Sequence, residues 1–228
     1  VKIIGRSGEH LLGLINDVLD MAKIEAGRTT FNSVDFNLHL LIDDIYNMLN
    51  LKAEQKDLKL VVEKAPDLPK YIRTDEGKLR QVLINLLSNA LKFTDEGRVC
   101  LMISARDGAR QNEAQPEKKT EKKADELASV EIEFTIVDTG IGVSSEELET
   151  VFEPFTQSQS GIQSQEGTGL GLPISQKFVR LMGGDISMIS RTDPDCLVST
   201  SADSTDVERL HPKQLHLPDK GTLVYYSI

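Results

Sequence analysis

Two glycine-bearing segments, about thirty residues apart, constrain this chain more than any other feature. The first, Asp-Thr-Gly-Ile-Gly at residues 138–142, follows an apolar run that is typical of a buried strand. The second, Gly-Thr-Gly-Leu-Gly-Leu at residues 167–172, precedes a helical pattern with Pro173 in its first turn. Because glycine has no Cβ, backbone at such positions can turn sharply and approach a ligand closely. The two segments therefore predict a strand end and a helix start that converge on one bound molecule.

A polar stripe follows one side of the helix predicted upstream of both segments, from an N-cap at Asp75 to Phe93. Asn85, Asn89 and Lys92 are spaced by four and three residues, so they share a helix face. Amide oxygens can ligate Mg²⁺, which prefers to share its coordination shell with substrate phosphates. Taken alone, three polar residues fit an ordinary solvated face better than a binding site.

Each glycine segment has a chemical use and a plain alternative. The carboxylate of Asp138 can accept a hydrogen bond from the exocyclic amine of adenine, although Asp and Gly also mark ordinary turns. Free N–H groups at the helix start of residues 167–172 suit a triphosphate. A dinucleotide-binding fingerprint needs a strand directly before its glycines, whereas residues 156–166 are rich in Gln and Ser, and no Walker-type P-loop occurs.

Composition narrows the classes of partner. The formal charge of −10 over 228 residues argues against a general nucleic-acid binder, which needs a basic face. No apolar run approaches the roughly 18 to 20 residues of a membrane span, and the N-terminus lacks a signal-peptide pattern. We therefore expect a cytoplasmic chain with no nucleic-acid partner and no direct membrane contact.

The order of patterns predicts an α/β (α+β) two-layer sandwich, in which helices cover one face of a mixed, mostly antiparallel sheet, plus an N-terminal helix. Two polar stretches, at about 107–128 and about 191–220, are expected to be a flexible insert and a loop. The predicted helices span 1–27, 38–55, 75–93 and 174–182, and the predicted strands 34–36, 58–62, 71–74, 99–105, 130–137 and 222–226.

Taken in order, these segments resemble the ATP-binding domain of sensor histidine kinases, a branch of the ATPase superfamily that includes gyrase, Hsp90 and MutL. Four motifs carry the resemblance, which covers nearly the whole chain and implies a Bergerat-type ATP-binding fold. They are the Asn-bearing helix at 81–94, the glycine motifs at 138–142 and 167–172, and Phe-Glu-Pro-Phe at 152–155; the stretches 183–186 and 221–222 resemble the closing strands.

The resemblance implies a role for each matching residue. Asp138 would bind the adenine amine, Phe93 would pack on the ring, and Thr222 would support the pocket. Asn89 with Asn85 would hold Mg²⁺, Lys92 would reach phosphate, and a lid at about 156–166 would close over ATP. The remaining ATP-binding positions are Gly140, Gly142, Gly167, Thr168, Gly169, Leu170 and Gly171.

Residues 1–30 resemble the second helix of the family's dimerisation and phosphoacceptor hairpin, and residues 31–228 the catalytic domain. The first helix of the hairpin, with its phosphoacceptor motif, is missing, and none of the four histidines stands in such a context: His10, His39, His211 and His216. No catalytic residue is therefore assigned, and autophosphorylation of this chain alone is not expected. The implied partners are a response regulator receiver domain, the phosphoacceptor hairpin and a second copy bound through the N-terminal helix.

The predicted activity is transfer of the ATP γ-phosphoryl group to a histidine, for relay to an Asp of a response regulator. Such a transfer depends on positioning and charge neutralisation. The resemblance leaves open a membrane anchor in the parent kinase.

Two alternatives to the kinase function remain at this point. One is a self-contained ATPase of the same superfamily, against which Asn85 counts because such enzymes carry a general-base Glu one turn before Asn89. The other is a nucleotide-binding interaction module that transfers no phosphoryl group.

Overall fold

The computed structural model describes residues 2–107, 130–156, 168–193, 196–199 and 220–228. The predicted insert at about 107–128 and the predicted lid at about 156–166 fall almost wholly outside these ranges. Gly167, His211 and His216 lie outside them as well, and the side chain of His10 is not described.

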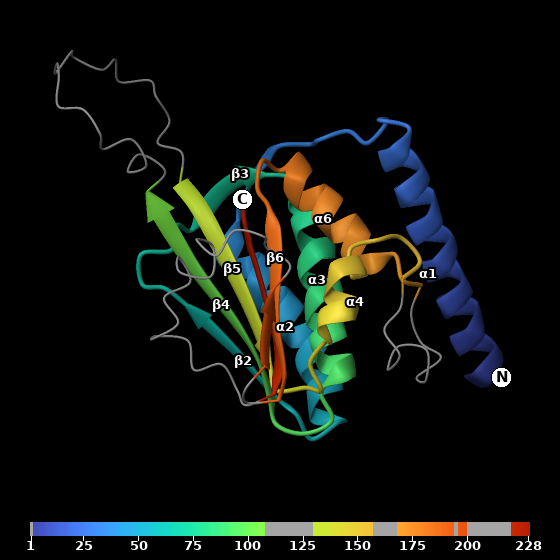
Figure 1. The fold of residues 1–228 in the computed structure, drawn as a ribbon. Coiled ribbons are helices and arrows are strands. Elements are labelled where there is room, and N and C mark those ends of the chain that lie inside the picture. The colour runs from blue at the N-terminus through green and yellow to red at the C-terminus, as the bar shows by residue number, and fades with distance from the viewer. Residues whose placement is uncertain (1, 108–129, 157–167, 194–195, 200–219) are drawn as a thin grey trace, which may run out of the picture.

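One layer of the molecule is a six-stranded sheet in the order β2-β4-β5-β8-β6-β7, in which β2 and β4 run parallel and the other neighbours antiparallel. Helices lie on one side of it (Figure 1), which confirms the predicted sandwich. A second sheet pairs β1 with β3. The strands are β1 (Val34–Asn37), β2 (Lys59–Lys64), β3 (Tyr71–Thr74), β4 (Arg98–Asp107), β5 (Val130–Asp138), β6 (Ile186–Asp193), β7 (Cys196–Ser199) and β8 (Gly221–Ser227).

The helical layer consists mainly of α3 (Glu76–Phe93), which packs against α6 (Gly171–Leu181), α2 (Leu38–Glu54) and the sheet. The N-terminal α1 (Lys2–Glu25) lies outermost, against α6 (Figure 1). A short helix, α4 (Ser145–Thr150), was not predicted. Its signal was present in the sequence, because Ser144 and Glu147 form a capping box that stabilises the helix start.

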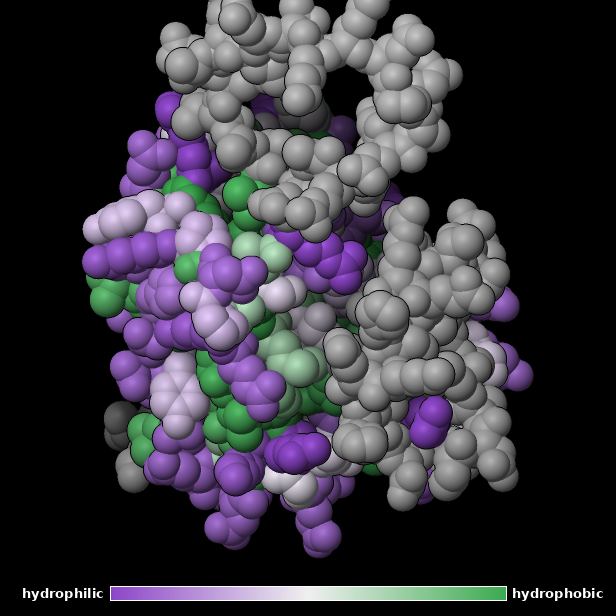
Figure 2. Space-filling model, turned by 90° about the vertical axis from the view of Figure 1, so that its left-hand side faces the viewer, coloured by the Kyte–Doolittle hydropathy of each residue, from purple (hydrophilic) through white to green (hydrophobic). Residues whose placement is uncertain are grey.

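The sheet face away from the helices is mixed in character. Figure 2 shows the molecule from that side, with apolar side chains gathered between polar ones. The most buried polar group there is Glu133, which accepts a hydrogen bond from the Tyr225 hydroxyl (2.7 Å) and pairs with Arg106 (2.8 Å). Burial, and then the hydrogen bond to Glu133, raises the pKa of Tyr225.

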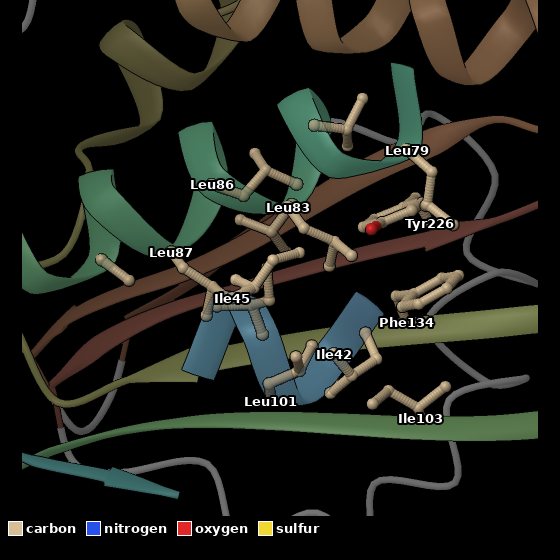
Figure 3. Close-up of a cluster of buried hydrophobic side chains, with 14 of the residues drawn as sticks. Ile42, Ile45, Leu79, Leu83, Leu86, Leu87, Leu101, Ile103, Phe134 and Tyr226 are labelled. Carbon is tan, nitrogen blue, oxygen red and sulfur yellow. The ribbon is translucent and has the colours of Figure 1, made fainter. Parts of the chain in front are cut away.

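The core lies between α3 and the sheet. Leucines spaced three and four residues apart on α3 meet alternate residues of β4 and β5, because those spacings place side chains on one helix face and one strand face. Phe134 stacks on Tyr226 with 4.8 Å between ring centroids. Figure 3 shows this cluster, including Ile42, Ile45, Leu79, Leu83, Leu86, Leu87, Leu101 and Ile103.

The prediction of a loop over about 191–220 is wrong at its beginning. The strand β6 continues through Arg191 to Asp193, and β7 pairs back on it after an irregularity in the register. Ladder hydrogen bonds with β8 and β7 satisfy this backbone, so polar side chains are tolerated where the sequence pattern indicated a loop. The predicted loop from residue 200 to 219 lies outside the described residues.

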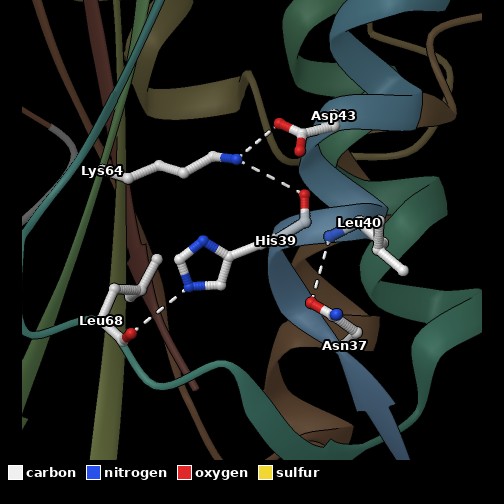
Figure 4. Close-up of polar contacts among 6 residues, drawn as sticks. All are labelled: Asn37, His39, Leu40, Asp43, Lys64 and Leu68. Carbon is white, nitrogen blue, oxygen red and sulfur yellow. Dashed lines mark hydrogen bonds and ion pairs between the residues drawn. The ribbon is translucent and has the colours of Figure 1, made fainter.

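Side-chain contacts stabilise the start of α2. Asn37 caps α2 through the backbone N–H of Leu40, and Lys64 bonds to Asp43 and to the backbone oxygen of His39 (Figure 4). The ring of His39 lies 3.3 Å from the Leu68 carbonyl oxygen. The ring of His39 therefore contacts the segment that leads into β3.

Asp75 caps α3 and also holds the segment that follows α1. Its carboxylate accepts from the backbone N–H groups of Lys78 (3.1 Å) and Asn32 (2.9 Å) and pairs with the Lys78 ammonium at 2.6 Å. Burial acts to raise the pKa of Asp75, but these contacts outweigh it and hold that pKa below its usual value.

Candidate nucleotide-binding site

Asp138 stands at the end of β5 and is almost fully buried, with 7% of its surface exposed. The backbone N–H groups of Gly140 (2.9 Å) and Thr222 (3.1 Å) both donate to its Oδ1. The carboxylate therefore makes both of its hydrogen bonds to other described residues through the same oxygen, Oδ1. The second oxygen, Oδ2, remains available to accept from a ligand.

The pKa of Asp138 is raised to about 6. Burial is the main cause, because a carboxylate loses hydration when it leaves water, and the two backbone donors offset only part of that loss. The ionised form of Asp138 is therefore costly in this buried position. A ligand that donates a hydrogen bond to the carboxylate would stabilise that form.

A buried serine that the sequence reasoning missed connects the strands around Asp138. Ser190 Oγ, on β6, accepts from the backbone N–H of Val143 (2.7 Å) and donates to the carbonyl of Gly221 (3.2 Å). It also lies 3.2 Å from the hydroxyl of Thr222. Only 1% of Ser190 is exposed. No motif marks this residue; its role depends on the β6–β8 register, which pairs it with Thr222.

The first glycine segment is needed for packing inside the protein. A Cβ on Gly140 would overlap the backbone oxygen of Phe93, and one on Gly142 would overlap that of Arg191. Gly142 also has a φ of +77°, which side-chain-bearing residues rarely adopt. From the sequence, these glycines were expected to let the backbone approach a ligand closely. The structure adds that they let the segment 138–142 lie directly against the end of α3 and against β6.

On α3, the predicted polar residues occupy different environments. Asn85 donates through Nδ2 to the hydroxyl of Ser175 on α6 (2.8 Å), another residue that the sequence reasoning did not single out. The side chain of Asn89 is half-buried and makes no hydrogen bond to any other described residue. Lys92 lies with its ammonium 4.8 Å from the ring centroid of Phe93.

The second glycine segment packs between α3 and the phenylalanine motif. A Cβ on Gly171 would overlap the carboxamide of Asn85, and one on Gly169 would overlap the backbone of Phe155. Gly169 accepts a hydrogen bond from the Phe155 N–H (3.0 Å). Phe155 has a φ of +64° and 68% of its surface exposed. This contact places the phenylalanine motif beside the glycines.

The hydroxyl of Thr168 donates to Asp17 Oδ2 of α1 (3.1 Å) and accepts from the backbone N–H of Leu170 (3.0 Å). A pocket lies in this region between α1, α3 and α6. Its lining includes Asp17, Gln81, Asn85, Ser88, Gly171 and Ser175.

The site therefore has two parts. The strand end comprises Asp138, Gly140, Gly142, Ser190 and Thr222. The helix end comprises Asn85, Asn89, Thr168, Gly169, Leu170 and Gly171. Phe93 lies beside the strand end, because its backbone oxygen accepts from the Ile141 N–H (3.3 Å), and its ring contacts Lys92 of the same helix. Direct contacts join Asp138 to Gly140 and Thr222 at the strand end. At the helix end, Asn85 lies against Gly171, and Thr168 bonds to Leu170.

The donor set of the helix end fits Mg²⁺ better than a thiolate or imidazole metal. Within the described ranges, no three His, Cys, Asp or Glu side chains gather into a metal-binding group. Amide oxygens of Asn85 and Asn89 are hard ligands, suited to an ion that takes its other ligands from water and phosphate.

Comparison with known proteins now identifies the family. The family described as "Histidine kinase-, DNA gyrase B-, and HSP90-like ATPase" matches residues 74–213. This range contains the Asn-bearing helix and both glycine segments. The chain belongs to this family, and the resemblance inferred from its motifs is confirmed.

Curated relatives include two sensor kinases. The signal transduction histidine-protein kinase BarA of Escherichia coli K12 is 36% identical over 192 residues, which are 84% of this chain and 19% of BarA. The sensor protein GacS of Pseudomonas syringae pv. syringae is 37% identical over 188 residues, 82% of this chain and 19% of GacS. The chain thus spans about a fifth of the length of these relatives.

Solved structures support the same fold. Full-length ShkA in complex with AMPPNP is 26% identical, with a TM-score of 0.67, over 97% of this chain and 36% of ShkA. The histidine kinase ThkA in complex with the response regulator TrrA has a TM-score of 0.59 at 18% identity, over 100% of this chain and 49% of ThkA, and shows the fold alone. None of the described helices is long and apolar enough to cross a membrane.

Proposed function

We propose that this chain is the ATP- and Mg²⁺-binding catalytic domain of a sensor histidine kinase, which transfers the γ-phosphoryl group of ATP to a histidine. One observation carries the proposal: a buried carboxylate, Asp138, is fixed through Oδ1 by two backbone donors and keeps Oδ2 for a ligand. An exocyclic amine such as that of adenine is a donor from which this oxygen can accept. The likeness to ShkA, whose structure is a complex with AMPPNP, supports a nucleotide as the ligand of this chain.

The residues of the two ends would divide the nucleotide between them. Asp138 and Thr222 would bind the adenine, with Phe93 packed on the ring and Gly140 and Gly142 shaping the turn. At the helix end, the backbone from Thr168 to Gly171, with Gly167, would hold the phosphates, because α6 begins at Gly171 and its free N–H groups favour anions. Lys92 would reach a phosphate.

Asn89 and Asn85 would hold Mg²⁺ through their amide oxygens. Asn89 makes no hydrogen bond to another described residue, so its oxygen is available to the ion without breaking such a bond. Mg²⁺ would neutralise phosphate charge during transfer. The work of this chain is to position the nucleotide and exclude alternative geometries, because phosphoryl transfer needs little covalent chemistry from the protein.

In the transfer itself, a histidine nitrogen would form the new P–N bond as the bond between the γ-phosphorus and the bridging oxygen breaks, and ADP would leave.

The likeness to histidine kinases and the helical form of α1 support a role for residues 1–30 as the second helix of a phosphoacceptor hairpin, with dimerisation through it. The phosphoryl group would pass to a response regulator receiver domain. A cytoplasmic location remains a prediction from the sequence.

The first test is calorimetric titration of the chain with ATP in the presence of Mg²⁺. Saturable binding that Asp138→Asn abolishes and Asn89→Ala weakens would support the site. The absence of binding by the wild type at millimolar ATP would refute it. Adding a separate phosphoacceptor hairpin with labelled ATP then tests transfer: a labelled hairpin supports the kinase, whereas tight ATP binding without transfer identifies a nucleotide-binding interaction module.

A further inference from the structure

The N-terminal helix α1 has two apolar sides, and the structure uses one of them. Met21 is buried, and Ile24, three residues later, packs against the core of the catalytic domain. The residues of the other side are exposed: Leu11, Ile15, Val18 and Leu19. The helix therefore lies against the domain along a narrow strip, a kind of contact that is compatible with reversible docking.

Two carboxylates lie on the docked side of α1. Asp17, one turn before Met21, accepts the hydrogen bond from the Thr168 hydroxyl, and Asp20 accepts from the Gln81 amide (3.3 Å). Burying charged groups in a helix interface opposes docking unless they find polar partners. In agreement with this, burial and the neighbouring Asp20 raise the pKa of Asp17, although the bond from Thr168 lowers it. The polar partner that offsets the cost of burying Asp17 is Thr168, which belongs to the second glycine segment.

In this arrangement, polar groups of the helix end are turned toward the protein. The Thr168 hydroxyl donates a hydrogen bond to Asp17, and its oxygen accepts one from the backbone N–H of Leu170. Asn85 is bonded to Ser175 and packed against Gly171. Phosphate oxygens are acceptors and need these N–H and O–H donors, and a carboxylate beside them repels phosphate charge.

We propose that α1 is a latch that competes with the triphosphate for the second glycine segment, with Asp17 occupying the Thr168 hydroxyl in the closed state. The inference rests on the proposed function, because it takes residues 168–171 as the phosphate-binding segment. Competition of this kind is reciprocal: docked α1 weakens ATP binding, and bound ATP releases α1 by the same factor. Release would also expose Met21 and the rest of the docked strip to other partners.

The test compares ATP affinity among variants at Asp17. Asp17→Ala removes both the acceptor and the charge, and Asp17→Asn removes the charge and keeps an acceptor for Thr168. We expect Asp17→Ala to bind Mg²⁺-ATP about fivefold more tightly than the wild type, the factor for one hydrogen bond of about 1 kcal/mol, with Asp17→Asn in between. Glu25→Gln is the matched control, since it neutralises an exposed carboxylate in the last turn of α1.

Hydrogen exchange gives a second readout on the same proteins. Saturating Mg²⁺-ATP should speed amide exchange over residues 11–25 in the wild type, and Asp17→Ala should do so without nucleotide. Equal ATP affinities in the wild type and Asp17→Ala, or unchanged exchange in α1, would overturn the latch while leaving the proposed function intact. Weaker Mg²⁺-ATP binding by Asp17→Ala would instead make Asp17 part of the binding site. No ATP binding by any variant would refute the proposed function, and the latch with it.

Discussion

The strand end and the helix end of the candidate site satisfy their polar groups in different ways. At the strand end, backbone N–H groups hold Asp138, and Ser190 joins three strand or loop segments within the sheet. At the helix end, side chains bond to side chains of other segments: Asn85 on α3 to Ser175 on α6, and Thr168, before α6, to Asp17 on α1. Contacts that involve the backbone of a sheet are costly to rearrange, whereas contacts between side chains can exchange partners. One end is therefore preformed, and the other can change with the position of α1.

The largest expected effect is on nucleotide affinity at the strand end. In Asp138→Asn, the amide oxygen must take the place of Oδ1 to satisfy Gly140 and Thr222, so Nδ2 would face the adenine amine. Two donors then oppose each other, and we expect ATP affinity to fall about 1,000-fold. Calorimetry measures this change. Asp35→Asn, at an exposed carboxylate on β1, should bind ATP like the wild type.

The same substitution should stabilise the empty protein. The folded pKa of Asp138 is about 6, above its usual 3.8, so its contribution to stability is fully present below about pH 4 and is lost as pH rises to about 6. Asn does not titrate, and we expect Asp138→Asn to raise the free energy of unfolding at pH 7 by about 3 kcal/mol. The gain should disappear near pH 4.

Urea unfolding at the two pH values tests this sign. Asp75→Asn supplies the opposite case, because the pKa of Asp75 is lowered and its stabilisation is present at neutral pH and lost on acidification. Equal gains for Asp138→Asn at both pH values would show that ionisation is not the cause.

Ser190 tests whether the strand end is a single network. In Ser190→Ala, the Val143 N–H and the Gly221 carbonyl lose a buried partner, and we expect the free energy of unfolding to fall by about 2 kcal/mol. Urea unfolding gives the value. Ser187→Ala, on the same strand but only half-buried, is the matched control and should change stability little. A loss no larger than the control's would mean that water replaces the hydroxyl.

A smaller effect than those at Asp138 and Ser190 is expected at Asn89, and it tests whether the helix end binds the metal. Asn89→Ala should weaken ATP binding about tenfold in Mg²⁺, the loss of one hard oxygen ligand, and should leave binding in EDTA unchanged. Paired titrations with and without Mg²⁺ measure this difference. An equal loss in both conditions would place Asn89 on the nucleotide itself, and the assignment of the metal to this helix face would then be wrong.

Local sequence patterns were enough to predict several residues of the candidate site. Asp138 was predicted because it ends an apolar strand, and Asn85 and Asn89 because their four-residue spacing puts them on one helix face. Such features need only the chain's own neighbours, and the observed β5 and α3 match them. The capping box of Ser144 was equally local and could have predicted α4.

Other parts depended on packing between distant segments. Ser190 works through the register of β6 with β8, and the strand continues past Arg191 because β8 and β7 supply its backbone partners. Gly140 is required by the position of Phe93, 47 residues earlier in the chain. A local sequence pattern cannot predict such contacts, because the residues that make them are far apart in the chain.

The sequence by itself determined the chemistry of the candidate site: a carboxylate, amides and glycines, which lie within the range that the family matches. Only the tertiary structure decided the state of that site. In the folded chain, Thr168 bonds to Asp17, a residue 151 positions away, and Asn85 bonds to Ser175. The physical reason is that residue chemistry and short-range periodicity are written along the chain, whereas the partner of a hydrogen-bonding group is chosen by which surfaces pack together.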